Sequence, residues 1–323
     1  MKFKVKAEFE NQRLDKFLTQ KIKDQTRSQI KKIIEQGLVT INGKKATVHQ
    51  FLKTDDLIEV NSNSKTVTPT KKARLLPETI VAPKIIFENE NFLVIDKPTG
   101  LLVHPTQKGE TNTLADWLKI KYPKIVKVGD NTYRAGIIHR LDRDVSGVMV
   151  IAKNNLAFGY LKDQFKKRKV KKEYLAIVYG QMTKESGEIN LPIGRNQEGQ
   201  FVAHPKQSSK KLQTSDKIAK TKYQTIELIK DYSVLAVQIL TGRTHQIRAH
   251  LFAIGHPIIG DQIYKPKKKI FTLLRRRIKL IQTDRIMLHS KKIGFYNLNN
   301  EWVEFIAPVP KKINDFIYDQ KIK

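Results

Sequence analysis

The chain has 323 residues, which is long enough for two or three domains with a substantial core. Its formal net charge of +30 argues against an ordinary metabolic enzyme and indicates a polyanionic partner, nucleic acid first and an anionic membrane second, although lysine-biased codon usage would give the same composition. Cysteine is absent, which excludes disulfides, cysteine-bound zinc and a thiol nucleophile.

The N-terminal segment MKFKVKAEFE alternates charged and apolar residues, as a strand does, and lacks the apolar core of a signal peptide. No uninterrupted apolar run reaches the roughly 18 residues that a membrane span needs. Together with the missing cysteines, these features predict a soluble protein of the reducing cytoplasm. We expect it to act as a monomer, without a membrane partner.

Residues 1–60 have the pattern of a small, separate α/β domain. Apolar residues at helical spacing predict a first helix over residues 14–22. A second helix is predicted to begin after Thr26, with Gln29 as its capping partner, and to end at Gly37. Asn42-Gly43 predicts the turn of a β-hairpin. The polar faces of the two helices carry basic side chains that are candidates for binding RNA, with a merely solvated surface as the alternative: Arg13, Lys16, Arg27, Lys31 and Lys32.

The order of these elements resembles the S4 RNA-binding domain over residues 11–60. The resemblance is carried by RLDKFL, by TRSQIKKIIEQGLVTINGK and by a strand that contains Asp56 and Ile58. It implies that the helix pair docks onto structured RNA. Residues 61–80 are polar and rich in Ser, Thr, Pro and Lys, so we interpret them as a flexible linker. Such a linker would raise the local concentration of the rest of the chain on a bound RNA.

Residues 81–323 are predicted to form a second, larger domain. Strand-like runs at Ile85–Phe87, Phe92–Ile95 and Leu101–His104 are predicted to be neighbours in a sheet. Later strands are predicted at 173–180, Lys222–Ile229, Ser233–Leu240 and Trp302–Ile306, and helices at Thr113–Tyr122, Asn155–Lys167 and Gln246–Ile254. Because these helices are scattered among the strands without a βαβ rhythm, the pattern favours an α+β fold with a mixed, largely antiparallel sheet and flanking helices.

The stretch GIIHRLDRDVSG, residues 136–147, concentrates polar chemistry between two apolar runs. We interpret residues 137–138 as the end of a buried strand and Ser146-Gly147 as a tight bend before the next strand. A loop between buried strands rests on a rigid scaffold, where functional groups tend to lie. Asp142 lies between Arg140 and Arg143, which would keep its carboxylate ionised. The stretch predicts a charged Asp in a basic cleft; a surface loop with ordinary ion pairs is the alternative.

Two more regions are rich in basic residues. The run 166–172 leads into a strand with Tyr174 near its start, and Arg248 lies on a short helix just after the tight turn TGRTH. The segment Lys265–Leu280 interleaves basic and apolar residues, which predicts an amphipathic helix on RNA or on a membrane, or a solvated helix at the domain edge. The chain has no internal repeat, Walker loop, GxGxxG or HExxH motif.

Five segments, in chain order, resemble the RluA-type pseudouridine synthases. They are IDKPTGLLVHP (95–105), HRLDRDVSG (139–147), KKEYLAIVYG (171–180), TGRTHQIRAHLFAIGHPIIGD (241–261) and RIMLHSKKIGF (285–295). The resemblance covers about residues 85–310, and an S4-like N-terminus is typical of the family's large-subunit rRNA branch. Two positions depart from the family: Val145 replaces a usual Thr, and YNLNN follows Phe295 where many members have His-Pro. The first bears on local packing and the second on fine substrate choice.

The resemblance implies the pseudouridine synthase fold and an enzyme that converts uridine to pseudouridine in structured RNA, with 23S rRNA as the expected substrate. The N1–C1′ bond breaks, uracil turns over in the site, and C5 joins C1′. Substrate and product are isomers, so the reaction needs no cofactor, and no metal is expected. By resemblance Asp142 is the reacting carboxylate, and three roles are open to it: attack at C1′, stabilisation of positive charge there, or removal of a sugar proton. Asp144 and Asp96 are weaker candidates, because turn formation or ion pairing explains them.

The same resemblance assigns the remaining site residues. Arg248 pairs with Asp142, Tyr174 stacks on the uracil ring, and Leu288 forms the opposite wall. Arg140 holds the RNA displaced when the uridine flips out of its helix or loop, or fills the gap. Each has an ordinary alternative: a surface Arg, a core Tyr or Leu, or an ion pair within the loop.

The histidines 139, 245 and 250 are expected to be structural. Two functional rivals stay open. One is a pseudouridine synthase specific for tRNA. The other is a non-catalytic RNA-binding or ribosome-assembly factor, which would have no use for Asp142, Tyr174 and Arg248 together.

Overall fold

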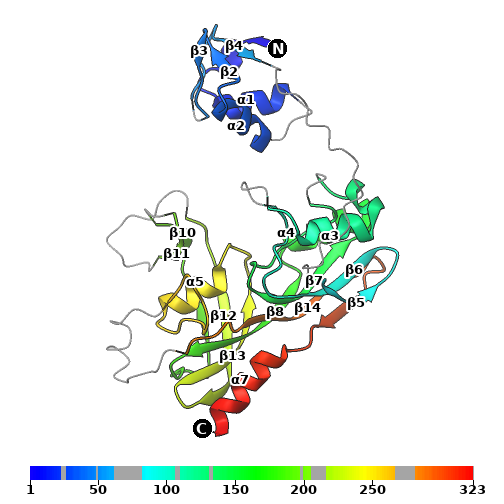
Figure 1. The fold of residues 1–323 in the computed structure, drawn as a ribbon, viewed down its shortest axis with the longest axis vertical. Helices are drawn as coiled ribbons and strands as arrows, with labels where there is room; N and C mark the ends of the chain where they lie inside the picture. Colours follow the sequence, from blue (N-terminus) through cyan, green and yellow to red (C-terminus); the bar gives the residue numbers. More distant parts are fainter. Residues whose placement is uncertain are drawn as a thin grey trace. The chain divides into compact units, whose positions relative to one another are not determined.

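The computed structural model describes residues 1–22, 27–48, 50–61, 82–105, 110–130, 134–196, 199–204, 216–265 and 281–322. The chain divides into two compact units, Met1–Ala73 and Arg74–Lys323 (Figure 1). Thr26, the predicted linker 61–80 beyond its first residue, and the basic segment Lys265–Leu280 beyond its first residue lie outside the described residues. No helix within the described ranges has the length and apolar character needed to span a bilayer.

The first unit is a small α/β domain built around one apolar core. Its elements are β1 (Lys2–Lys4), η1 (Ala7–Phe9), α1 (Leu14–Lys21), α2 (Arg27–Glu35), β2 (Val39–Ile41), β3 (Lys44–Lys45) and β4 (Leu57–Val60). The sheet order is β1-β4-β2-β3. The predicted turn of the hairpin is confirmed, since Asn42 and Gly43 have φ of 50° and 76°. Gly37, at φ 74°, follows α2 as predicted.

The second unit is built on a nine-stranded sheet with the order β5-β6-β7-β14-β8-β13-β12-β9, and β15 pairs with β14. Only the β7–β14 pair is parallel among the strands of this sheet, so the prediction of an α+β fold with a largely antiparallel sheet is confirmed. The strands are β5 (Lys84–Glu88), β6 (Phe92–Lys97), β7 (Ser146–Ala152), β8 (Lys171–Tyr179), β9 (Ser186–Ile189), β12 (Thr221–Ile229), β13 (Tyr232–Ile239), β14 (Leu288–Tyr296) and β15 (Trp302–Ile306).

Helices pack on both faces of the sheet. They are α3 (Leu114–Lys121), η2 (Pro123–Lys127), α4 (Asn155–Lys166), α5 (Gln246–Ala253) and α7 (Lys311–Ile322), and a separate hairpin is formed by β10 (Ile193–Arg195) and β11 (Phe201–Ala203). Alternate residues of β7 serve different cores: Met149 packs in the cluster that contains α3, and Val148 packs in the one that contains Leu161 of α4. Because this central strand is buried on both faces, its residues from Val148 to Ala152 are all apolar.

Three local predictions were wrong. Leu101–His104 is not a strand, because the carbonyls of Leu102 and Val103 accept hydrogen bonds from the first turn of α3 and not from a neighbouring strand. Ile137 forms only an isolated bridge, to Ile151, and does not end a strand. Ser146-Gly147 is not a bend but the start of β7.

Gly147 has a structural reason of its own. Its φ is +122°, and a Cβ at this position would lie 2.2 Å from the backbone oxygen of Ser290. The glycine therefore lets β7 approach the neighbouring strand β14 closely at the point where both strands begin. The loop before β7 therefore ends where β7 begins to pair with β14.

The sequence reading also left elements out. The short strands β9, β10 and β11, the central strand β14 and the helix α7 were not predicted. In α7 only Ile313 is fully buried, so its apolar stripe is weak. Strands of three or four residues are too short for alternation to stand out from chance.

Candidate active site

The loop that precedes β7 carries Asp142. Because β7 and β14 run parallel, with Ser146 opposite His289, this loop lies beside the start of β14. The strand β8 runs antiparallel to β14 on its other side, so Tyr174 is opposite Ser290. Three segments from distant parts of the chain therefore meet at one end of the central strands, where β14 lies between β7 and β8 (Figure 1).

Arg248 completes this meeting point from α5. Its Nη1 donates to Oδ2 of Asp142 at 3.1 Å, across 106 positions of sequence. The predicted ion pair is thus confirmed. The Arg248 side chain is only 4% exposed and the Asp142 side chain 19%, so the pair is largely withdrawn from water while the carboxylate stays reachable. Within the described ranges, no group donates to Oδ1 of Asp142.

A second carboxylate, Asp261, orients the guanidinium, and the sequence reading assigned it no role. Arg248 Nε and Nη2 donate to the two Asp261 oxygens at 2.7 and 2.8 Å. The Asp261 carboxylate also accepts from the backbone N–H groups of Ile263 and Tyr264. A bidentate pair of this kind fixes the plane of the guanidinium as well as its position. Sequence analysis could have singled out Asp261, because it is the last residue of the segment 241–261 that resembles the family.

The charge of Arg248 is secured by this arrangement. Burial disfavours the guanidinium charge, but the hydrogen bonds and negative charges of Asp261 and Asp142 outweigh burial and raise the pKa of Arg248. Burial raises the pKa of Asp261, but its bonds to Arg248 outweigh this and lower that pKa below its ordinary value. Arg248 therefore stays cationic, with one face held by Asp261 and Nη1 directed at Asp142.

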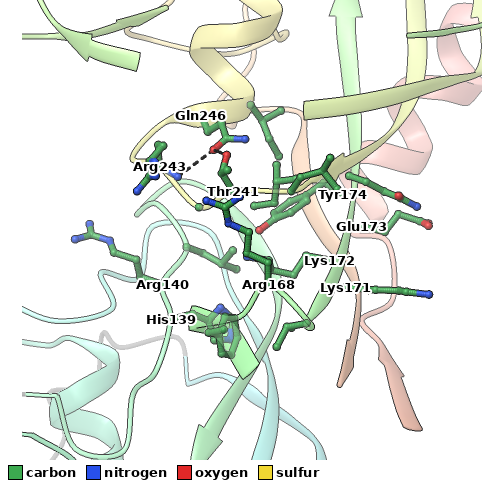
Figure 2. Close-up of a pocket in the computed structure, with 18 of the residues that line it drawn as sticks. His139, Arg140, Arg168, Lys171, Lys172, Glu173, Tyr174, Thr241, Arg243 and Gln246 are labelled. Carbon is green, nitrogen blue, oxygen red and sulfur yellow. Dashed lines mark hydrogen bonds between the residues drawn. The ribbon is translucent and has the colours of Figure 1, made fainter. Parts of the chain in front are cut away.

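These groups open into one large basic cavity of about 950 Å³ (Figure 2). The loop residues, the start of β8 and the turn before α5 surround it. Its carboxylates are Asp142, Glu173 and Glu304. Its cations are more numerous: Arg140, Lys166, Arg168, Lys169, Lys171, Lys172, Lys220, Arg243, Arg248 and Lys292. Concave, positively charged walls of this kind concentrate an anionic ligand.

Tyr174 and Leu288 both line this cavity, as does Asp142. Tyr174 is 6% exposed and Leu288 is 3% exposed. Burial, and secondarily the charge of Asp142, raises the pKa of Tyr174, while a hydrogen bond with Ser290 opposes the shift. The Tyr174 side chain is therefore a neutral phenol whose ring forms part of the wall. An apolar and an aromatic wall around one carboxylate suit a flat heterocycle.

The other candidate residues of the loop have different surroundings. Arg140 is exposed at the cavity, and its Nη1 lies 3.5 Å from Nε2 of His104. Asp144 is exposed and Asp96 half-buried, and neither lines the cavity. Val145, which replaces the usual Thr, is buried in the main core beside the cavity.

The histidines divide into two kinds. His139 Nε2 accepts from the Val150 N–H at 3.1 Å, and His250 bonds Thr221 and the Leu191 carbonyl, so both tie elements together as predicted. His245 lines the cavity, as His139 also does, and its Nε2 lies 3.8 Å from Asp142 Oδ2. No group of three or more His, Asp and Glu side chains in the described ranges is arranged to hold a metal ion.

The turn before α5 is ordered by Gln246, which sequence reasoning also missed. Its Oε1 accepts from Thr241 Oγ1 at 2.7 Å and from the Arg243 N–H at 3.0 Å (Figure 2). Its Nε2 donates to the Lys220 carbonyl and to Thr221 Oγ1. His245 ends the turn in the left-handed region, at φ 55°. Gln246 thus sets the entry into the helix that carries Arg248.

The residues predicted to bind RNA in the first unit differ in their surroundings. Arg13 is half-buried and donates to both oxygens of the fully buried Asp15, at 3.0 and 3.1 Å. Lys31 is half-buried on α2. The side chains of Arg27 and Lys32 lie outside the described residues. Arg13 therefore neutralises a buried carboxylate within its own unit.

Comparisons with known proteins agree with one another over most of the chain. The sequence model of a family described as RNA pseudouridylate synthase matches residues 91–253, and that of the S4 domain matches residues 12–58. An uncharacterized RNA pseudouridine synthase of Aquifex aeolicus is 35% identical over 95% of this chain and 93% of the relative. The ribosomal large subunit pseudouridine synthase D of Pasteurella multocida is 34% identical over 95% of this chain and 89% of the relative. The solved structure of human RNA pseudouridylate synthase domain containing 1 covers 77% of this chain and is itself covered to 98%, with a TM-score of 0.55 and 25% identity.

Proposed function

Because the chain belongs to the RNA pseudouridylate synthase family, and so isomerises uridine in RNA, we propose that its substrate is the 23S RNA of the large ribosomal subunit and that Asp142 is its reacting carboxylate. The observation that carries the proposal is the 3.1 Å contact between Asp142 Oδ2 and Arg248 Nη1 inside a basic cavity. The relatives named for large-subunit RNA support the substrate class, as does the matching S4 domain. They favour it over tRNA and over a non-catalytic role.

The reaction requires one bond to break and one to form at the same sugar carbon. The C1′–N1 bond of uridine breaks, the detached uracil turns, C5 bonds C1′, and the proton of C5 is lost while N1 gains one. Atoms and charge balance without a cofactor. We assign Oδ1 of Asp142 to the ribose, because Oδ2 is held by Arg248 and no described group donates to Oδ1. Attack at C1′, stabilisation of charge at C1′ and removal of a sugar proton are all compatible with that position.

The walls of the cavity have matching roles in the proposal. The Tyr174 ring supports the uracil during its rotation, with Leu288 as the opposing wall. Arg140, exposed at the mouth of the cavity, contacts the RNA that closes behind the flipped uridine. The first unit holds the RNA through the α1–α2 pair, with Lys31 and the other cations of α2 as the proposed contacts. We further propose that the enzyme works as a monomer in the cytoplasm.

The proposal is tested by Asp142→Asn with Asp144→Asn as the matched control. Asp142→Asn keeps the shape of the side chain and removes its charge, so turnover of an unmodified 23S RNA transcript should fall by about a thousandfold or more. RNA affinity should not fall, since a negative charge is removed from a basic cavity. Asp144→Asn makes the same chemical change on an exposed carboxylate and should keep wild-type turnover.

Two results would contradict the proposal. Retained turnover in a folded Asp142→Asn chain would remove Asp142 from the chemistry. Mapping of pseudouridines in RNA from cells with and without the gene would refute the substrate class if the difference fell outside large-subunit RNA.

A further inference from the structure

Lys172 lies in the basic cavity but has no place in the chemistry described above. It is two residues before Tyr174 on β8, and side chains two apart on a strand point to the same face. Both line the cavity, and Figure 2 shows both there. The rise of a strand places them about 7 Å apart. Lys172 is therefore a neighbour of the proposed base-binding wall.

The surroundings of Lys172 do not balance its charge. Its Nζ lies 5.4 Å from the centre of the Phe165 ring, and that ring stacks on His139 at 4.7 Å. Burial lowers the pKa of His139 to about 3, with the charge of Lys172 adding to the effect, so this imidazole is neutral. Among the described residues, no carboxylate lies within ion-pair distance of Lys172 Nζ. Burial lowers the pKa of Lys172 to about 8.

A half-buried ammonium without a counter-charge is unfavourable by itself. It becomes favourable when a ligand supplies an anion, because attraction is stronger in a poorly hydrated site. The neighbouring residues of the basic run 166–172 add positive charge but no carboxylate. Four of them line the same cavity: Lys166, Arg168, Lys169 and Lys171. Lys171, by contrast, lies over the Trp302 ring at 5.2 Å. The start of β8 thus attracts an anion, and Lys172 is the half-buried cation there.

The position along β8 indicates which anion. The charge of Asp142 acts on Tyr174, and the charge of Lys172 acts on His139. Tyr174, Lys172 and Asp142 all line the same cavity. A group bound at Lys172 is therefore next to the proposed uracil wall and next to the basic run 166–172. When one nucleotide is turned into the cavity, the backbone phosphates that flank it are the anions that RNA brings to this lining.

We propose that Lys172 binds a backbone phosphate of the RNA next to the flipped uridine, and so helps to hold the nucleotide in the cavity. The inference rests on the proposed RNA substrate. Lys172 is a substrate-binding residue in this proposal, not a participant in bond making. It should therefore act on affinity and on KM, not on kcat.

The test compares Lys172→Met and Lys172→Arg with Lys222→Met, an exposed lysine of β12 that does not line the cavity. Binding of an unmodified 23S RNA transcript is measured at several salt concentrations, and kcat and KM are measured on the same RNA. Lys172→Met should weaken binding about tenfold, raise KM similarly and leave kcat unchanged. The slope of log affinity against log salt should become shallower by about 0.7–0.9, as expected for one lost phosphate contact. Lys172→Arg should keep the slope, and Lys222→Met should match wild type.

Two outcomes would overturn the proposal. If Lys172→Met has the wild-type affinity and salt slope, Lys172 contacts no phosphate. If its kcat falls while KM and the slope are unchanged, Lys172 acts on the uracil instead. Lys172→Gln repeats the test should the Met variant lose its thermal unfolding transition. An error in the proposed substrate would be recognised separately, because the wild-type protein would then convert no uridine in the transcript. The salt dependence of binding would still show whether Lys172 contacts a phosphate.

Discussion

Arg248 is held by Asp261 on one side and directed at Asp142 on the other, so two carboxylates share one buried guanidinium. The two contacts are not equivalent. The Asp261 side chain is fully buried, while the Asp142 side chain is 19% exposed. The first contact orients the guanidinium, and the second presents a carboxylate to the cavity. The precision of the site thus depends on a residue that does not line the cavity.

Asp261→Asn tests this dependence. The amide cannot pair with both Arg248 nitrogens, so a cation is left partly uncompensated and the free energy of unfolding should fall by about 3–5 kcal/mol. We expect kcat to fall at least about tenfold, with little change in the KM for RNA, because Arg248 no longer fixes Asp142. Asp261→Glu should recover part of kcat. Asp130→Asn, which breaks an exposed ion pair with Lys162, should cost at most about 1 kcal/mol and leave kcat unchanged. An Asp261→Asn enzyme with wild-type kcat would contradict the role.

His289 gives a prediction for pH. It is fully buried between Ser146 and the Ala307 carbonyl. Burial lowers its pKa from 6.5 to about 4, against the opposing Ala307 contact and with help from the charges of Arg285 and Lys291. The unfolded chain binds this proton below about 6.5 and the folded chain only near 4, so stability is present above pH 6.5 and is lost as pH falls through this window. The melting temperature should therefore fall between pH 7 and pH 4.5, and fall less in His289→Gln. Equal losses in both proteins would exclude the effect.

At the scale of elements, the loop that carries Asp142 is fastened to the end of β6. Lys97 is fully buried, and its Nζ donates to the carbonyls of Pro98, Leu101 and Arg143 at 2.8, 2.8 and 3.0 Å. Thr99 Oγ1 adds a bond to the Asp144 carbonyl at 2.6 Å. These contacts hold the irregular segment that follows β6 against Arg143 and Asp144, the two residues after Asp142. Buried carbonyls without a donor are costly, and Lys97 satisfies those of Pro98 and Leu101, while that of Arg143 also accepts from the Gly100 N–H.

Lys97→Met removes these donors and keeps the apolar stem. It should lower the free energy of unfolding by about 2–4 kcal/mol, because the carbonyls of Pro98 and Leu101 lose their donor, while that of Arg143 keeps the Gly100 N–H. Since the loop loses its anchor, kcat should fall as well. Urea denaturation and turnover measure the two effects, with Lys84→Met on the exposed face of β5 as the control. Unchanged unfolding would show that water replaces the ammonium.

At the scale of the whole molecule, the chain joins a small unit with its own core to a larger unit that holds the entire cavity. The net charge of +30 exceeds what the cavity alone accounts for. Much of the electrostatic attraction to RNA therefore acts outside the reacting site. Such attraction is independent of sequence and weakens with salt.

Removal of residues 1–60 should separate these contributions. We expect RNA affinity to fall by about one to two orders of magnitude and its salt dependence to become shallower, because phosphate contacts are lost. The remaining chain keeps its own core and should turn over the RNA at saturating concentration. Filter binding across a salt series and turnover provide the measurements. Unchanged affinity and slope would show that the first unit makes no RNA contact.

The prediction of the larger elements from sequence succeeded for several elements with apolar faces. It missed the largely buried strand β14, whose sequence LHSKKIGFY is interrupted by polar residues. The buried strands β7 and β8 and the helices α3 and α4 follow apolar patterns that reflect their own burial. Leu101–His104 shows the limit of this signal. Its apolar residues are buried as expected, but its carbonyls pair with a helix that begins ten residues later. The hydrophobicity of the side chains predicts which residues are buried. The hydrogen-bonding partner of a backbone group depends on the tertiary structure.

The candidate site shows the same division. The sequence by itself determined the chemical groups: a carboxylate at 142, a guanidinium at 248, a phenol at 174, and a charge suited to RNA. The tertiary structure alone decided that Asp261 holds Arg248, that Gln246 shapes the turn, that His245 joins the cavity and that Arg13 serves Asp15. The reason is physical: residue type sets what a side chain can donate, accept or carry as charge. Which partner it meets depends on packing, since strand pairing brings together groups that are far apart along the chain.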